Sequence, residues 1–179
     1  MRHPTIVLVP VKAFSKAKLR LAPVLDDAGR AALAREMADC VLAAARDLPV
    51  AVVCDDDDVA AWARAAGVDV VWTPGLDLTA AVQHAVDNVD AERAVVAHAD
   101  LPDAVDLTVV TGHQGVIAVP DRRDDGTNVL AVPTGAGFRF AYGPGSFARH
   151  VAEAERLGLA LTVLRPADLT RDVDVPADL

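Results

Sequence analysis

Short apolar runs, rich in β-branched residues, alternate along this chain with Ala-rich stretches whose apolar positions recur three and four residues apart. The short runs predict strands, and the Ala-rich stretches predict helices with one buried face. We expect strands at 6–11, 50–54, 68–72, 94–98, 116–119, 128–132, 139–142 and 161–164. We expect helices at 28–46, 58–66, 78–88 and 146–157.

This alternation is typical of an α/β fold, in which helices connect the strands of a mostly parallel sheet and cover both of its faces. The later strands follow one another closely, which predicts an antiparallel or mixed extension of the sheet. No internal repeat, low-complexity linker or break in composition divides the chain. A single domain over residues 1–179 is therefore expected, and this length suits one hydrophobic core.

Composition narrows the range of partners. Hydrophobic residues make up 53% of the chain and charged residues 24%, and the formal net charge is −9. This is the wrong sign for a general binder of nucleic acid or anionic membranes. No apolar run approaches the ~20 residues of a membrane-spanning helix, and the N-terminus does not resemble a signal peptide. We therefore expect a cytoplasmic protein, with Cys40 and Cys54 as small buried residues rather than ligands or a disulfide.

In an open α/β sheet, ligands bind beyond the carboxyl ends of the strands, so the loops that follow strands deserve the closest reading. The loop after the first strand contains every Lys of the chain, namely Lys12, Lys16 and Lys18, and also Arg20. Lys supplies a compact charge and Arg a planar fork for phosphate oxygens. The cluster indicates polyphosphate binding, and the alternative is a solvated basic loop.

Asp100 follows the apolar run at 94–98, where a carboxylate can hold a divalent cation for nucleotide chemistry. Its alternative role is to cap the following turn. We expect His98 to be a packed strand residue rather than a ligand.

A third group combines Thr127 and Asn128 with Gly143, Gly145 and Ser146. The glycines allow the backbone to approach a ligand, and Ser146 adds a hydroxyl near the free amides of a helix start, which suits an anion. The alternative is a turn that only starts a helix. Neighbouring Arg149 and His150 either reinforce the charge or face solvent.

Two acidic clusters remain. In an extended segment Asp172 and Asp174 point to the same side, so both can approach one cation, and a solvated tail is the alternative. The run 55–58 contains four Asp residues where a helix is expected to begin. We interpret this run as helix capping on a solvated face rather than as a metal site.

Five segments in order carry a resemblance over nearly the whole chain. They are Val9-Pro10-Val11-Lys12 with Ala17-Lys18-Leu19-Arg20-Leu21, Ala99-Asp100-Leu101-Pro102, Gly126-Thr127-Asn128, Gly143-Pro144-Gly145-Ser146-Phe147 and Asp172-Val173-Asp174-Val175-Pro176. Together they resemble the 2-phospho-L-lactate and phosphoenolpyruvate guanylyltransferases of coenzyme F420 biosynthesis, which have a three-layer nucleotidyltransferase fold like that of the nucleotide-diphospho-sugar transferases.

The resemblance implies a Mg²⁺ site at Asp100, Asp172 and Asp174, with GTP as co-substrate. It implies that Lys12, Lys18 and Arg20 face the GTP phosphates. The resemblance also implies that the phosphorylated three-carbon acid lies among Thr127, Asn128, Gly143, Gly145 and Ser146. Handing the labile product to the downstream transferase would follow.

The sequence departs from the family pattern at Thr79, where related chains usually carry Asn in a segment that resembles part of the nucleotide pocket. Between the acceptors, the Ala- and Arg-rich, Lys-poor composition favours phosphoenolpyruvate by association alone, and 2-phospho-L-lactate stays open. Another nucleotidyltransferase, acting on a molybdenum cofactor or a sugar phosphate, is disfavoured because residues 10–20 contain no Gly. A signalling receiver module and a non-catalytic nucleotide-binding relative are remoter alternatives.

Overall fold

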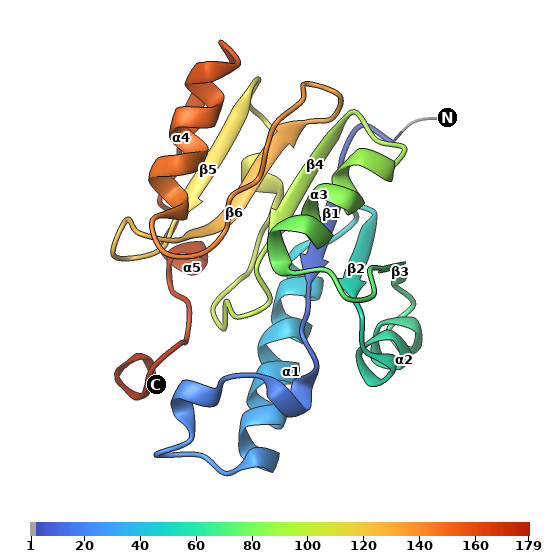
Figure 1. Cartoon of the computed structure of the whole chain (residues 1–179), viewed down its shortest axis with the longest axis vertical. Coiled ribbons are helices and arrows are strands. Elements are labelled where there is room, and N and C mark those ends of the chain that lie inside the picture. Colours follow the sequence, from blue (N-terminus) through green and yellow to red (C-terminus); the bar gives the residue numbers. More distant parts are fainter. Residues whose placement is uncertain (1–2) are drawn as a thin grey trace.

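The computed structural model describes residues 3–179, so the first two residues of the expected domain lie outside it. Its centre is a seven-stranded sheet (Figure 1), with the strand order β3-β2-β1-β4-β6-β5-β7. The strands are β1 (Ile6–Pro10), β2 (Val50–Cys54), β3 (Asp69–Trp72), β4 (Arg93–Ala97), β5 (Val116–Pro120), β6 (Thr127–Pro133) and β7 (Leu161–Val163). The helices are α1 (Asp27–Ala44), α2 (Asp57–Ala65), α3 (Leu78–Asn88), α4 (Ser146–Arg156) and the short α5 (Ala167–Thr170).

The sheet is parallel on one side and mixed on the other, as expected. Strands β3, β2, β1 and β4 run parallel, β6 is antiparallel to both β4 and β5, and β7 is parallel to β5. Because β6 runs in the opposite direction, its first residues lie at the same end as the carboxyl ends of β1 and β4. This reversal brings Thr127 and Asn128 to the edge where Asp100 lies.

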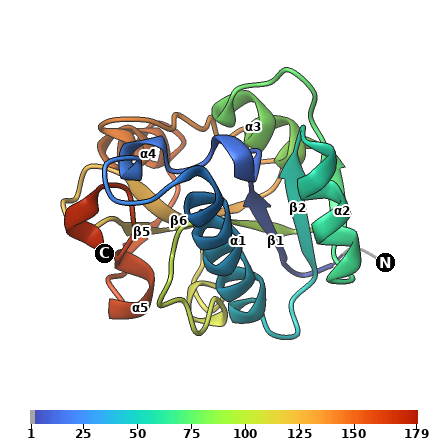
Figure 2. The same cartoon turned by 90° about the horizontal axis from the view of Figure 1, so that it is seen from below.

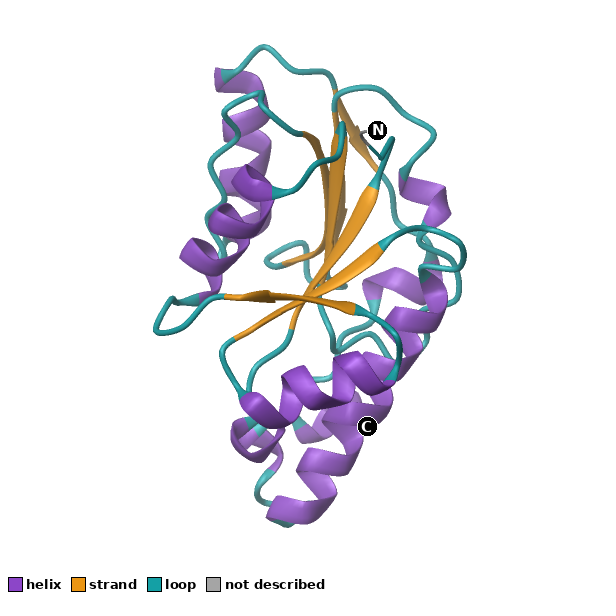
Figure 3. Cartoon of the chain, turned by 90° about the vertical axis from the view of Figure 1, so that its right-hand side faces the viewer, coloured by secondary structure: helices purple, strands orange, loops and turns teal. Residues whose placement is uncertain are grey.

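Helices cover both faces of the sheet, which Figure 3 shows from the side. Side chains alternate along each strand, so that Val7 and Val9 pack with α1 and α2 whereas Leu8 packs with α3. The central strands are buried on both faces, which explains why they appear in the sequence as continuous apolar runs. The fold is α/β with three layers, as expected.

One predicted strand is wrong. Residues 139–142 form an extended segment that pairs with no strand. Its backbone N–H groups donate to side chains of α3 and α4 instead, with acceptors at Thr79, Gln83, His150 and Glu153. The alternation of Phe140 and Tyr142 with small or polar residues imitates a strand, but side-chain acceptors replace the hydrogen bonds of a ladder.

Aspartates start three of the helices. Asp26, Asp56 and Asp77 each accept a hydrogen bond from a backbone N–H three residues further on. This confirms the capping interpretation of the acidic run at 55–58 for Asp56, and Asp57 and Asp58 lie in the first turn of α2. Cys54 is buried as expected, whereas Cys40 is only half-buried, and both thiols are free.

None of the helices within residues 3–179 is long and apolar enough to cross a membrane.

Candidate active site

The loops that carry the predicted binding residues meet in one cleft at the carboxyl end of the parallel strands. In Figure 1 the blue loop after β1 and the red C-terminal segment both lie at the lower end of the molecule, and Figure 2 views the molecule from that end. The cleft has a volume of about 920 Å³, and residues from all four sequence segments line it. This size is that of a site for a nucleotide-sized ligand.

Lys18 is the central cation of this cleft. Its Nζ lies 2.7 Å from Oδ2 of Asp100 and 3.1 Å from Oδ1 of Asp174. The residue adopts a left-handed backbone conformation, with φ 54° and ψ 39°, between two short 3₁₀ turns. A non-glycine residue in this conformation is uncommon, and here it directs the ammonium group into the cleft.

The Lys18–Asp100 pair is electrostatically tight. Burial alone would raise the pKa of the Asp100 carboxyl, but the Lys18 ammonium holds that pKa below its usual value. Burial would likewise lower the pKa of Lys18, and Asp100 and Asp174 together raise it. Both groups are therefore charged at neutral pH, so positive and negative charge are concentrated at the same point of the cleft.

The carboxylates around Lys18 fit a divalent cation by two signs. Oδ1 of Asp100 is buried and has no hydrogen-bond partner. Burial, followed by repulsion from Asp100 and Asp174, raises the pKa of Asp172. Mg²⁺ prefers oxygen ligands such as carboxylates. A cation bound here would use the free oxygen of Asp100 and relieve the repulsion between the carboxylates. Within residues 3–179, however, no three potential ligands are close enough to hold an ion as they stand, because Lys18 lies between Asp100 and Asp174.

The segment that carries Asp174 is held by a buried carboxylate that the sequence analysis missed. Oδ2 of Asp178 accepts the backbone N–H groups of Asp174 and Val175, and its Oδ1 pairs with Arg122 at 2.9 Å. Val173 N–H also donates to the carbonyl of Asp100. The Asp172–Asp174 segment is therefore tied to the strand end at Asp100 and does not form a free tail.

The predicted acceptor residues come together from β6 and α4. Thr127 and Ser146 are buried, and their hydroxyl oxygens lie 3.4 Å apart. Gly143 lines the cleft with φ 103°, in the region that favours glycine. Two of the predicted residues bond to other parts of the protein. The side-chain amide of Asn128 donates to the carbonyl of Leu169, and the Gly145 N–H donates to the side chain of Asp125.

The turn between β5 and β6 holds this half of the cleft in place. Asp121 accepts the backbone N–H groups of Arg123, Asp125 and Gly126. The carbonyl of Asp125 accepts the Phe147 N–H at the start of α4. The sequence analysis did not single out Asp121 or Asp125, although an Asp preceding a Gly-containing turn is a recognisable signal.

Arg149 is exposed, in line with one of its two expected roles, whereas His150 does not face solvent. The Arg149 guanidinium donates to the carbonyls of Ala141, Tyr142, Gly143 and Pro144, so its donors hold the loop rather than a ligand. His150 is fully buried instead of facing solvent. Its position four residues after Ser146, on the same helix face, is the signal that could have placed it.

The remaining predicted residues lie on or beside the cleft. Lys12 lines the cleft with an exposed side chain, and Arg20 is 75% exposed with its nitrogen 4.0 Å from an oxygen of Asp174. Thr79 does not line the cleft, because its hydroxyl accepts the Tyr142 N–H. His98 packs against Tyr142 with ring centroids 5.1 Å apart, as expected for a packed residue.

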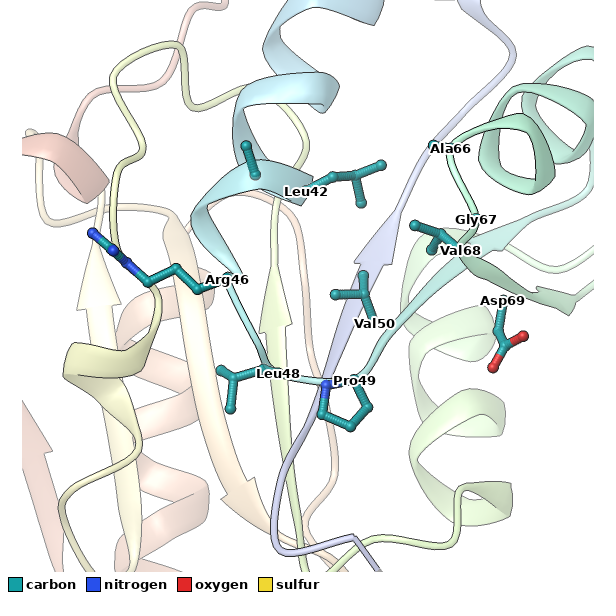
Figure 4. A pocket seen from close by; sticks show the side chains of 10 residues that line it. Leu42, Arg46, Leu48, Pro49, Val50, Ala66, Gly67, Val68 and Asp69 are labelled. Carbon is teal, nitrogen blue, oxygen red and sulfur yellow. The ribbon is translucent and has the colours of Figure 1, made fainter.

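A second hollow lies at the opposite end of β2 and β3 (Figure 4), with a volume of about 520 Å³. Apart from Arg46 and Asp69, its lining side chains are apolar, and these two charged residues lie on opposite sides. Arg46 already pairs with Asp106 at 3.4 Å. None of the predicted site residues lines this hollow, whereas most of them line the cleft around Lys18.

A family model described as "Guanylyl transferase CofC like" matches residues 5–179. The chain belongs to this family. It is 38% identical to a phosphoenolpyruvate guanylyltransferase of Roseiflexus sp. (strain RS-1), over 96% of this chain and 82% of the relative. It is 31% identical to a 2-phospho-L-lactate guanylyltransferase of Methanothermobacter thermautotrophicus, over 98% of this chain and 82% of the relative.

The fold of this guanylyl transferase family member is also shared with solved structures. A protein from Desulfovibrio desulfuricans G20, described as a nucleotide-diphospho-sugar transferase, superposes with a TM-score of 0.75 at 23% identity. That likeness covers 97% of this chain and 83% of the other. The expected nucleotidyltransferase fold is thereby confirmed.

Proposed function

We propose that this protein transfers GMP from GTP to phosphoenolpyruvate, forming enolpyruvyl-diphospho-5'-guanosine and pyrophosphate in coenzyme F420 biosynthesis. The observation that carries this proposal is the Lys18 ammonium held between Asp100 and Asp174 in the cleft. A reaction between a phosphate monoester and a nucleoside triphosphate is favoured by carboxylates that can hold a cation and by a positive charge for the phosphoryl oxygens. Asp100, Asp172 and Asp174 are the candidate carboxylates in this cleft, and Lys18 supplies the positive charge.

The proposed chemistry needs no protein nucleophile. An oxygen of the acceptor phosphate attacks the α-phosphorus of GTP, a new P–O bond forms, and the bond from the α-phosphorus to the bridging oxygen breaks to release pyrophosphate. Since a phosphate monoester is already ionised near neutral pH, no general base is required. Catalysis then consists of positioning two anions and stabilising charge on the transferring and leaving groups.

The residues divide between the two substrates. Lys12, Lys18 and Arg20 are proposed to bind the GTP phosphates, with Lys18 exchanging its carboxylate partners for phosphate oxygens as pyrophosphate departs. Thr79 would support the nucleotide half indirectly, because its hydroxyl is bonded to the Tyr142 backbone. The acceptor would lie against Thr127 and Ser146, with Asn128, Gly143 and Gly145 shaping the surrounding backbone.

Asp100, Asp172 and Asp174 are proposed to hold Mg²⁺. When bound there, the cation neutralises charge between the two phosphate groups. Two observations support this assignment: repulsion from Asp100 and Asp174 adds to burial in raising the pKa of Asp172, and Oδ1 of Asp100 is a buried acceptor without a hydrogen-bond partner.

The acceptor 2-phospho-L-lactate is the second candidate, because relatives of this family carry that name, including one at 34% identity from Halorubrum lacusprofundi. Relatives named for phosphoenolpyruvate reach 39% identity, which favours the planar acceptor. We further propose that the enzyme acts in the cytoplasm. Direct transfer to the next enzyme would protect the reactive diphosphate.

The test is Mg²⁺-dependent pyrophosphate release from GTP with each acceptor separately, with the downstream transferase added to consume the product. We expect turnover with phosphoenolpyruvate. Asp100→Asn should reduce it by at least about a hundredfold, the scale expected for a lost metal ligand. Asp69→Asn, in the hollow at the opposite end, is the matched control and should retain activity. Folded protein that is silent with both acceptors would contradict the proposed function.

A further inference from the structure

The side chain of His150 is fully buried behind the acceptor half of the cleft. Its Nδ1 lies 3.0 Å from the hydroxyl oxygen of Thr127, and its Nε2 lies 3.0 Å from the backbone nitrogen of Ala141. Three aromatic rings pack around the imidazole, those of Phe138, Phe140 and Tyr142. The imidazole thus connects the extended 139–142 segment to a hydroxyl that lines the cleft.

These two contacts determine where the imidazole carries its proton. Burial, followed by the charges of Arg149 and His98, lowers the pKa of His150 to about 4 against an opposing effect of Glu153, so the ring is neutral at pH 7. The Ala141 N–H can only donate, and Nε2 must therefore be the acceptor. The proton is assigned to Nδ1 by this network, and Nδ1–H donates to Thr127.

The position of this proton determines what the neighbouring hydroxyl pair offers to a ligand. Thr127 and Ser146 together have two hydroxyl protons, and one of them is used in the contact between their oxygens. With Nδ1 as a donor, the other proton stays free and can point into the cleft. With Nδ1 as an acceptor, it would take the Thr127 proton, and the pair would present only lone pairs to an anion.

We propose that His150 is a positioning residue that fixes the Thr127–Ser146 pair as a hydrogen-bond donor to the anionic acceptor substrate. It acts through Thr127 and does not touch the substrate. This inference rests on the proposed function in one respect, because that function supplies the phosphorylated acid as the ligand. The backbone N–H of Ala141 sets the direction of the whole chain of hydrogen bonds.

The first test is independent of activity. Long-range ¹H–¹⁵N NMR of the ligand-free protein identifies which ring nitrogen of a histidine is protonated, and the His150 signal is assigned by its loss in His150→Asn. We expect the Nδ1-protonated form to persist from pH 5 to pH 8. An Nε2-protonated ring would overturn the proposal, whatever the enzyme turns over.

The second test is kinetic. His150→Leu should raise the KM for the acceptor by about tenfold, the effect of one hydrogen bond to a charged group, with the KM for GTP within about twofold of wild type. His150→Asn keeps an N–H near the Nδ1 position and should recover part of the loss. If His150→Leu fails to fold, the acceptor KM of His150→Asn tests the proposal instead.

A double-mutant cycle separates this role from a merely structural one. Since His150 acts through the Thr127 hydroxyl, Thr127→Val and the double variant Thr127→Val/His150→Leu should have the same acceptor KM. Independent, multiplying losses would refute the proposal. His84→Asn on the exposed side of α3 is the matched histidine control. If wild-type protein turns over neither acceptor, the proposed function fails, while the NMR result still decides the proton position.

Discussion

Removing the positive charge of Lys18 should leave a carboxylate without its compensating partner inside the cleft. The side chains of Lys18 and Asp100 are only 11% and 21% exposed, and their charged atoms lie 2.7 Å apart. Lys18→Met keeps the length of the side chain and the same left-handed backbone demand, so it isolates the charge. Breaking a largely buried pair on one side costs about 3 kcal/mol or more, because the remaining charge is uncompensated.

For a chain of this size, that loss corresponds to a fall in Tm of roughly 6 to 12 °C. Thermal unfolding in a chelator, followed by circular dichroism, measures it. Lys16→Met is the matched control, because Lys16 is exposed in the same loop and should shift stability by no more than about 0.5 kcal/mol.

The carboxylates around Lys18 lead to two further expected changes in the Tm of Lys18→Met. Adding Mg²⁺ should raise the Tm of Lys18→Met more than that of wild type, because the cation no longer competes with the ammonium group. Lys18→Met/Asp100→Asn should be more stable than Lys18→Met in chelator, because the uncompensated charge is gone. A Lys18→Met variant that unfolds with the wild-type Tm in chelator would refute the view that the ammonium holds this cleft together.

Two further predictions concern the scaffold of the site. Burial would raise the pKa of Asp178, but the Asp174 and Val175 N–H groups and two arginines hold it below its usual 3.8, so its stabilisation is complete above that value and is lost as pH falls through the lower folded one. Asp178→Ala should cost about 2 kcal/mol in urea unfolding at pH 7, and this cost should shrink as the pH is lowered below 3.8. A cost that does not change with pH would contradict this account. At Gly115, with φ +75°, an added Cβ would lie 2.1 Å from the Ala160 carbonyl oxygen, whereas at Gly112 it would meet nothing within 4 Å. Gly115→Ala should therefore destabilise the fold by about 3 kcal/mol or more, and the control Gly112→Ala by less than about 1 kcal/mol. Similar unfolding midpoints for the two variants would contradict this prediction, because the backbone between β5 and β7 would then have moved apart at little cost.

The sequence was informative where local pattern and burial agree. The strand Val50–Cys54 is largely buried, and its apolar run predicted it with the right ends. Each of the other six observed strands was predicted to within one residue at each end. The cleft was also foreseeable in outline, because the carboxyl ends of parallel strands meet at one edge of a sheet. The residues at Lys18, Asp100 and Asp174 indeed come together there.

The sequence could not predict interactions between helices, strands or loops that are far apart along the chain. The segment around Phe140 reads as a strand because its aromatic residues alternate, and only the acceptors on α3 and α4 make it a loop. His150 was interpreted without knowledge of Thr127, which is 23 residues away and on another element. The buried anchor at Asp178 was hidden for the same reason, since acidic residues near a C-terminal segment usually indicate solvated chain.

The ion pair between Lys18 and Asp174 joins positions 156 residues apart. Closing a loop of this length costs more chain entropy than forming a local contact, so other parts of the fold must help to hold the two groups together. A ribosome-bound chain that has exposed β1 to β6 would have Lys18 and Asp100 but not the third charged partner. The charge cluster can therefore be completed only after the segment that carries Asp174 has emerged and bonded to the strand end at Asp100.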